Sequence, residues 1–147
     1  FNLKDRKHKS TKQLIHYLVK AAGYGSNLLL NVGPMPNGKI QEEHIESLKK
    51  IGSWIKVNGE TIYKSKKGPI NPTDEVASTQ IDNVIYIHLL NEKKIKYLLE
   101  GFTTKFRKIS YFKSNKKVSY KQNSEGIILF LDKKEINPIN TIIKIEL

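Results

Sequence analysis

The four histidines are the side chains in this sequence that could bind a metal ion through nitrogen, and the absence of cysteine excludes thiolate ligands. His16 and His44 fall in segments that we expect to be helical, and His88 falls in an expected strand. Neither these three nor His8 has a second ligand at the spacing that metal sites use. The sequence therefore predicts no metal site, and the missing cysteines exclude disulfides and a cysteine nucleophile.

Carboxylates could instead supply acid–base or nucleophilic chemistry. Residues 1–59 contain four: Asp5, Glu42, Glu43 and Glu46. The three glutamates stand at the start of an expected helix, where the helix dipole and solvation explain them. Asp5 lies in a lysine-rich segment without the apolar surroundings that tune a catalytic acid. We expect no catalytic carboxylate in this chain.

The formal net charge of +12 raises the question of nucleic-acid binding. Of the 26 basic residues all but Arg6 and Arg107 are lysine, whereas bidentate contacts to bases and phosphates favour arginine. Residues 1–59 and 60–147 each carry +6, so no basic arm stands out at this scale. We interpret the lysines as a compositional bias and expect no nucleic-acid partner. No apolar run approaches the length of a membrane span.

The expected secondary structure changes near Glu60, from two helices and one buried strand to a series of short strands. A capping box, Ser10 with Gln13, starts an amphipathic helix that should end at Gly23. "NLLLNV", residues 27–32, is apolar on successive positions, as in a strand buried on both faces. After a loop with two prolines, a second helix should run from about residue 42 to Asn58. We expect its buried stripe to comprise Ile45, Leu48, Gly52 and Ile55, with Ile51 and Trp54 beside it.

Residues 60–147 contain short runs rich in Ile, Val, Tyr and Phe, separated by turn residues at intervals of about ten. Asp82-Asn83 is one expected hairpin turn. These features predict an antiparallel β-sandwich, with a linker over residues 64–73. Five tyrosines in this part are expected to pack across the sheets: Tyr63, Tyr86, Tyr97, Tyr111 and Tyr120.

The strand over residues 27–32 lacks parallel partners in this sequence. A doubly buried parallel strand needs neighbours on both sides, and here only helices and antiparallel strands surround it. We therefore expect an α+β fragment. Residues 1–63 would be the last αβα unit of a (β/α) barrel, followed by a linker, 64–73, and a β-sandwich domain, 74–147.

The segment 9–63 resembles the end of the catalytic domain of α-L-fucosidases, glycoside hydrolase family 29. That family runs from a "LI..LV" helix into "GGNLLLN(I/V)GP..DG.I" and then "L..IG.W(L/I)..NGE.IY". Ser26 replaces the second glycine and Asn37 the usual Asp, both mild changes. The matching positions are Leu14, Ile15, Leu18, Val19, Asn27 to Asn31, Gly33, Pro34, Gly38, Ile51, Gly52, Trp54, Asn58, Gly59, Glu60, Ile62 and Tyr63.

The resemblance implies retaining hydrolysis of terminal α-L-fucosyl linkages, which uses two carboxyl groups and needs no cofactor. In the family both lie upstream of the matching segment, so this chain alone should be inactive. In such barrels the active site lies at the carboxyl ends of the strands. The expected rim of the substrate pocket is therefore Asn31, Gly33, Pro34 and Met35.

Asn31 could contact a sugar hydroxyl, orient a catalytic carboxylate or fix the loop backbone, whereas Asn27 opens the strand at the other end. The expected partners are the upstream barrel segment and, through the complete enzyme, fucosylated glycans. The resemblance implies a periplasmic or secreted location. The alternative interpretation is a non-catalytic carbohydrate-binding β-sandwich, which would present exposed aromatic residues to glycans.

Overall fold

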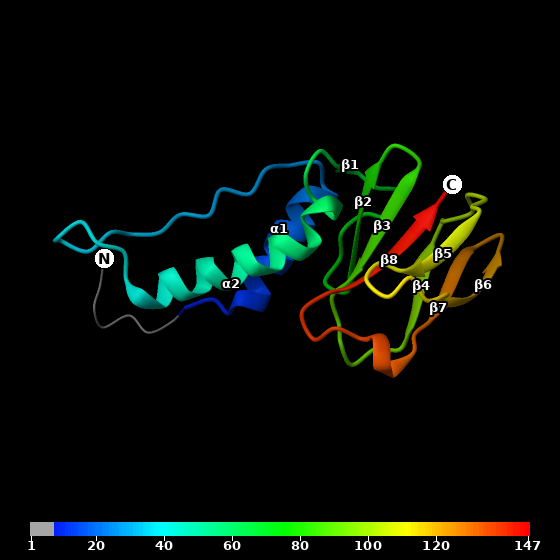
Figure 1. The fold of residues 1–147 in the computed structure, drawn as a ribbon. Coiled ribbons are helices and arrows are strands. Elements are labelled where there is room, and N and C mark those ends of the chain that lie inside the picture. The colour runs from blue at the N-terminus through cyan, green and yellow to red at the C-terminus, as the bar shows by residue number, and fades with distance from the viewer. Residues whose placement is uncertain (1–7) are drawn as a thin grey trace.

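The computed structural model describes residues 8–147, in which two helices precede a set of antiparallel strands (Figure 1). The helices are α1 (Thr11–Gly23) and α2 (Glu42–Asn58), followed by the short 3-10 helix η1 (Gly59–Thr61). The strands are β1 (Lys66–Lys67), β2 (Val76–Ile81), β3 (Val84–Leu89), β4 (Lys96–Glu100), β5 (Lys108–Tyr111), β6 (Ser119–Asn123), β7 (Gly126–Phe130) and β8 (Thr141–Glu146), with η2 (Lys133–Glu135) before β8. None of the described helices is long and apolar enough to cross a membrane.

Helix α1 begins and ends where local sequence signals place it. The Ser10 hydroxyl accepts a hydrogen bond from the Gln13 backbone N–H at 3.2 Å, and the Ser10 N–H donates to Gln13 Oε1 at 2.8 Å. This confirms the capping box. At the other end, a Cβ on Gly23 would lie 2.9 Å from Pro72 Cγ. Glycine there lets the helix end lie close against the chain that leads into β2.

The strands form two antiparallel sheets. One has five strands in the order β1-β2-β3-β8-β5, and the other has three in the order β4-β7-β6. The turn between β2 and β3 contains Asp82 at φ 47°, which confirms the predicted hairpin. Apolar residues of both sheets meet in one core, among them Ile87, Ile143, Leu99 and Leu129.

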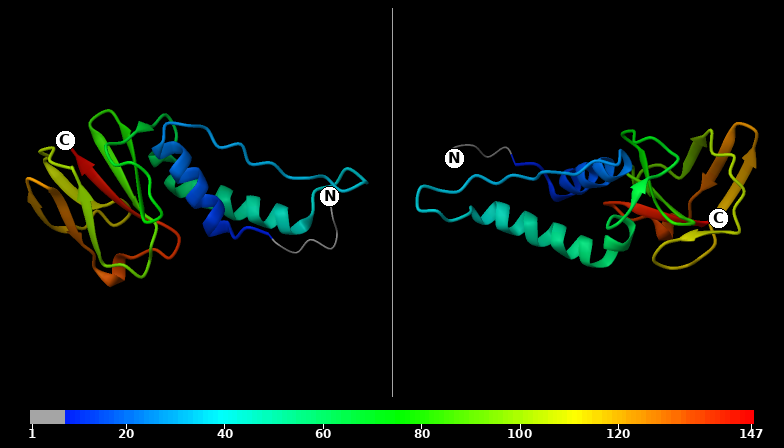
Figure 2. Two further views of the ribbon diagram at one scale, coloured as in Figure 1. Left: turned by 180° about the vertical axis from the view of Figure 1, so that it is seen from behind. Right: turned by 90° about the horizontal axis from the view of Figure 1, so that it is seen from above.

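Helix α1 packs on the outer face of the five-stranded sheet, whereas α2 joins it only through its C-terminal half and otherwise projects away from the sheets (Figure 2). Ile15 and Val19 of α1 and Ile51 and Trp54 of α2 join Tyr86 of β3 in a second buried cluster. Only 8% of Trp54 is exposed, and the predicted packing of this residue against the strands is confirmed. The central strands of the larger sheet are thus covered on both faces.

Residues 27–32 do not form the buried strand that the sequence predicts. The segment runs extended beside α2 without a ladder partner in the described chain, and the one isolated bridge nearby joins Pro34 to Ile40. Leu29 is 91% exposed and Leu30 is 38% exposed. The physical reason is that no described strand pairs with this segment: the strands of both sheets come from residues 66–146 and pair with one another.

The expected buried stripe of α2 is also partly wrong. The buried residues are Ile51, Trp54 and Asn58, while Leu48 is exposed and a Cβ added to Gly52 would meet nothing within 4 Å. Helix α2 contacts the sheet cluster through Ile51 and Trp54. Leu48 faces the extended segment across a cavity, and the side that carries Gly52 faces outward.

Residues 64–73 are bound to the larger sheet. Lys66 and Lys67 form β1, which pairs with β2. Further along, the Ser78 hydroxyl donates to the Ile70 carbonyl at 2.9 Å and accepts from the Ile70 N–H at 2.8 Å. The helices and the sheets are therefore joined by an ordered connection.

Candidate functional site

The loop after the extended segment is a hairpin at the end of the molecule opposite the sheets (Figures 1 and 2). The Gly38 N–H donates to the Met35 carbonyl, and the Met35 N–H donates to the Lys39 carbonyl, each at 2.8 Å. Gly38 has φ 78°, a conformation that favours glycine. Of the predicted rim residues in this hairpin, Pro34 is exposed and Met35 half-buried.

A cavity of about 200 Å³ lies between the extended segment, the residues before α1 and the first turns of α2. Asn31 is the one predicted rim residue that contributes to it, while Gly33, Pro34 and Met35 lie beyond it in the hairpin. The lining residues are His8, Lys9, Leu14, Leu30, Asn31, Val32, His44, Ser47 and Leu48.

Two histidines give this cavity its polar character. The rings of His8 and His44 lie 5.2 Å apart, edge to face. His44 Nδ1 is buried and has no hydrogen-bond partner in the described chain. Sequence reasoning treated both as isolated histidines, because they are 36 positions apart. The spacing of His44, Ser47 and Leu48 by three and four residues could have indicated that these three share one face of α2.

The cavity offers groups that bind hydroxyls but none that could attack a glycosidic carbon or protonate a leaving group as a carboxyl does. Its polar side chains are an asparagine amide, two imidazoles, a serine hydroxyl and an ammonium group. The side chain of Asn31 makes no hydrogen bond within the described residues, so its amide is free to bind another molecule. The described lining contains no carboxylate.

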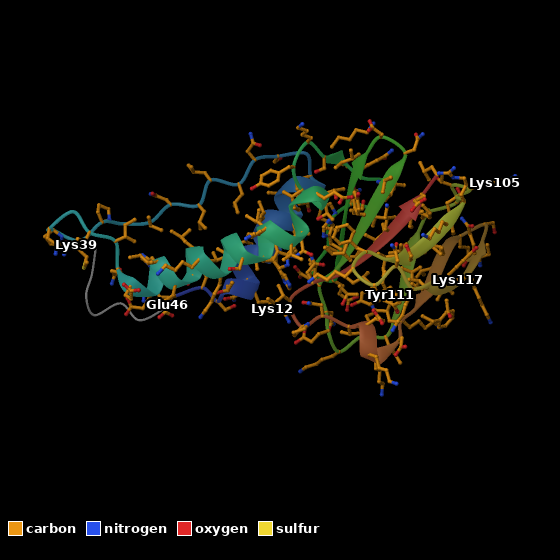
Figure 3. All side chains as sticks on the ribbon, in the orientation of Figure 1. Lys12, Lys39, Glu46, Lys105, Tyr111 and Lys117 are labelled. Atoms are coloured by element: carbon orange, nitrogen blue, oxygen red, sulfur yellow. The ribbon has the colours of Figure 1, made fainter. Side chains whose placement is uncertain are left out.

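The glutamates considered from the sequence lie away from this cavity. Glu42 and Glu43 are exposed in the first turn of α2, where the helix dipole favours them. Glu46 is exposed and lies 3.8 Å from Lys50, one turn along the helix (Figure 3). Asp5 lies outside the described residues. Within residues 8–147, no three metal-binding side chains cluster.

Most of the tyrosines in the strand region have structural roles. Tyr86, Tyr97 and Tyr111 are at most 4% exposed, which confirms the predicted packing for these three. Burial raises the pKa of Tyr97 to about 12, and its hydroxyl donates to the Asn91 carbonyl at 2.6 Å. Tyr63 and Tyr120, in contrast, are 61% and 40% exposed, so the prediction is wrong for them.

A buried polar network joins the helical part to the larger sheet. Asn140 Nδ2 donates to His88 Nδ1 at 3.0 Å, and His88 Nε2 donates to Thr79 Oγ1 at 3.1 Å. The Thr79 hydroxyl in turn donates to the carbonyl of Thr61, directly after α2, at 2.6 Å. Burial lowers the pKa of His88 to about 3, so the ring is neutral and structural.

Comparison with known proteins places the chain within one family. The family described as "Alpha-L-fucosidase" matches residues 1–60. Tissue α-L-fucosidase of Bos taurus is 32% identical over 123 residues, which is 80% of this chain and 26% of the bovine protein. Plasma α-L-fucosidase of Homo sapiens is 35% identical over 80 residues, or 51% of this chain and 17% of the human protein.

Solved structures of fucosidases share the whole described fold. α-L-Fucosidase isoenzyme 1 from Paenibacillus thiaminolyticus covers all of this chain at a TM-score of 0.85 and 23% identity, and the match takes up 37% of its own length. The Thermotoga maritima α-fucosidase in complex with fucose covers 93% of this chain at a TM-score of 0.81 and 26% identity, over 34% of its length. The chain thus spans about a third of these structures. The matches in sequence and in fold agree, and the chain belongs to the α-L-fucosidase family, glycoside hydrolase family 29.

Proposed function

We propose that this chain is the C-terminal part of a retaining α-L-fucosidase that hydrolyses terminal α-L-fucosyl linkages of glycans. In this proposal residues 1–63 close the catalytic (β/α) barrel, 64–73 connect, and 74–147 form the accessory β-sandwich. The nucleophile and the acid/base, two carboxyl groups about 5–5.5 Å apart in such enzymes, come from an upstream barrel segment. The chain by itself is therefore inactive.

The observation that carries the proposal is the exposure of an apolar segment that matches the family motif. Leu29 is 91% exposed although it stands in the middle of "NLLLNV". Burying a leucine side chain is worth about 1.5–3 kcal/mol, which this arrangement forgoes. Neighbouring parallel strands on both sides of residues 27–32 would bury the leucines and satisfy the backbone.

The exposed sides of α2 support the same arrangement. Leu48 and Val57, on opposite sides of the helix, are 38% and 57% exposed, and Gly52 presents bare backbone on the outward face. In a (β/α) barrel each helix packs on the strands and on the next helix, so α2 would have neighbours on more than one side. A glycine in the middle of a helix suits close approach of such a neighbour.

The position of Asn31 suggests its role in the complete enzyme. It ends the extended segment, borders the cavity and has no hydrogen-bond partner for its amide within the described residues. At the carboxyl end of a barrel strand, that amide would bond a fucose hydroxyl or orient an upstream carboxylate. Gly33, Pro34 and Met35 would shape the rim of the pocket from the hairpin beyond it.

Hydrolysis of an aryl α-L-fucoside by the product of the intact gene tests the proposal. We expect turnover with retention of the anomeric configuration, followed by NMR, and none from the purified 147-residue chain. Asn31→Ala should lower kcat/KM about 10- to 100-fold, the range for losing one hydrogen bond to a charged or buried group. Asn27→Ala, at the other end of the segment, is the matched control and should leave kcat/KM within about twofold.

Two results would contradict the proposal. Turnover by the 147-residue chain would show that it contains a catalytic pair after all. A well-folded product of the intact gene that hydrolyses no α-L-fucoside would show that the fold persists without the chemistry, and would favour the non-catalytic carbohydrate-binding interpretation.

A further inference from the structure

A pocket of about 220 Å³ opens on the sandwich between β5 and β6, at the end of the molecule away from the helices. β5 is the last strand of the five-stranded sheet and β6 the last of the three-stranded sheet. Residues 116–118 cover the edge of β5 through a bridge between Ser110 and Lys117, so the core stays buried and the pocket lies outside it. The residues that line the pocket, called here the edge pocket, are Phe106, Arg107, Lys108, Ile109, Asn115, Lys117 and Tyr120.

Two aromatic rings form one wall of the edge pocket. Tyr120 pairs with Leu129 of β7, which in turn pairs with Tyr97 of β4, and these two partners are buried in the core. Tyr120 thus points toward the core side of the smaller sheet but remains 40% exposed, because β6 has no neighbour beyond it. Its ring lies 5.2 Å from that of Phe106. The two ring planes are tilted by 57° to each other, so the exposed ring of Tyr120 is the aromatic face at this pocket and Phe106 packs beside it.

Basic side chains surround this wall. Between Glu100 and Glu125 the sequence contains seven basic residues and no acidic one. Arg107 is 4.0 Å from Glu146, whereas Lys108 and Lys117 form no ion pair within residues 8–147. Lys105 and Lys117 lie at the same end of the molecule (Figure 3). All the charged residues that line the edge pocket are therefore positive.

We propose that the edge pocket binds an anionic glycan, with a sugar ring stacked on Tyr120 and its sulfate or carboxylate group held by Lys117, Lys108 and Arg107. An exposed aromatic ring beside cations recognises a flat ligand face that carries negative charge. The choice of a glycan over a single-stranded nucleic acid, which uses similar contacts, rests on the proposed function.

The edge pocket is separate from the proposed active-site end. The hairpin over residues 34–40 and the edge strand β6 lie at opposite ends of the molecule in all views (Figures 1 and 2). Neighbours packed on residues 27–32 or on the outward face of α2 would leave the edge pocket uncovered. It would hold an acidic polysaccharide or glycan chain near the enzyme without taking part in hydrolysis.

Binding of the intact gene product to charged and uncharged sugar polymers tests the proposal. Dextran sulfate probes sulfate groups and uncharged dextran is its matched control, hyaluronan probes carboxylate groups, and oligo-dT probes nucleic-acid binding. Tyr120→Ala should weaken binding of the favoured polysaccharide about tenfold, within the range for one lost stacking contact. Lys117→Gln should weaken it and reduce the dependence of log Kd on log salt by about one unit.

Two matched variants separate the pocket from general charge and from misfolding. Tyr120→Phe keeps the ring and should bind like the wild type. Lys133→Gln removes an exposed lysine of η2, outside the edge pocket, and should change the affinity by less than about twofold. Thermal unfolding of each variant establishes that it is folded.

The outcomes are decisive in both directions. Binding of dextran sulfate or hyaluronan that falls with Tyr120→Ala and Lys117→Gln, but not with the two controls, supports the edge pocket and tells which acidic group it takes. Equal binding of dextran, no loss with Tyr120→Ala, an equal loss with Lys133→Gln, or tighter binding of oligo-dT through the same residues would overturn it. Turnover of α-L-fucosides is read separately, so either proposal can fail alone.

Discussion

Lowering the pH from 7 to 5 should destabilise this chain through His88, whose ring is fully buried and neutral. Burial lowers its pKa to about 3 in the folded state, against an ordinary value of 6.5. Protonation would remove the Nδ1 lone pair that accepts from Asn140. The network that ties Thr61, directly after α2, to the larger sheet would lose a member.

The size of the effect follows from the two pKa values. The unfolded chain binds the proton below pH 6.5 and the folded chain does so only near pH 3, so stability is complete above pH 6.5 and declines as the pH falls. One proton is worth 1.36 kcal/mol per pH unit, which gives a loss of about 2 kcal/mol at pH 5 and about 3 kcal/mol at pH 4. Carboxylates held by lysines, such as Glu75 and Glu135, have lowered pKa values and lose their contribution only below about pH 4.5.

Chemical denaturation of the wild type and of His88→Gln, at pH 7, 6 and 5 and constant ionic strength, measures the stability lost through His88. Glutamine can hydrogen-bond but does not titrate, and we expect it to cost about 1–2 kcal/mol at pH 7 through imperfect geometry. The stability gap between wild type and variant should then shrink by about 2 kcal/mol at pH 5. His16→Gln is the comparison variant: partial burial also lowers the pKa of His16, which bonds the carbonyl of Ile139 in the loop before β8, so its stability gap should shrink by less than that of His88→Gln.

A difference in unfolding free energy between wild type and His88→Gln that stays constant from pH 7 to pH 5 would refute the reasoning. It would mean that His88 titrates alike in the folded and unfolded states, which is incompatible with a neutral ring enclosed by Asn140 and Thr79. An equal change of the gap in His16→Gln would likewise remove the special role of the buried network.

Two glycine substitutions give further tests by denaturation. Gly52→Ala should stabilise the 147-residue chain by about 1 kcal/mol, because it lies in an exposed helix with nothing within 4 Å of the new Cβ. In the product of the intact gene the same change should be neutral or destabilising, since a neighbour would cover α2; equal stabilisation in both proteins would contradict that packing. Gly126→Ala should destabilise the chain by about 3 kcal/mol, because φ is 147° and the Cβ would lie 2.2 Å from the Leu99 carbonyl oxygen. A cost below about 1 kcal/mol would show that β7 can shift away from β4 at little expense.

Sequence reasoning succeeded where the signal is local. The capping box at Ser10 and the turn at Asp82 depend on a few neighbouring residues, and the structure confirms both. Trp54 could be assigned to packing because it adjoins an apolar helix face. The cavity beside Asn31 could not be predicted, since His8 and His44 come from different elements and no local pattern joins them.

Sequence reasoning failed where the burial of a residue depends on which elements lie next to it. "NLLLNV" has the composition of a buried strand, but burial depends on neighbours, and the described chain supplies none for Leu29. The helix α2 was assigned one buried stripe, although Ile51 and Trp54 face the sheet while Leu48 lines the cavity beside Asn31. Charge summed over residues 1–59 and 60–147 concealed the basic run between Glu100 and Glu125, which a shorter window would have found.

Hydrogen exchange at the backbone amides of Leu28, Leu29 and Leu30 tests the central claim most directly. The claim is that residues 27–32 form a barrel strand whose partners come from upstream chain. In the isolated 147-residue chain these amides should exchange nearly as fast as in an unfolded peptide, because the segment has no ladder partner among the described residues. In the product of the intact gene they should exchange at least about a thousandfold more slowly, as in a central strand. Fast exchange in both proteins would contradict the account.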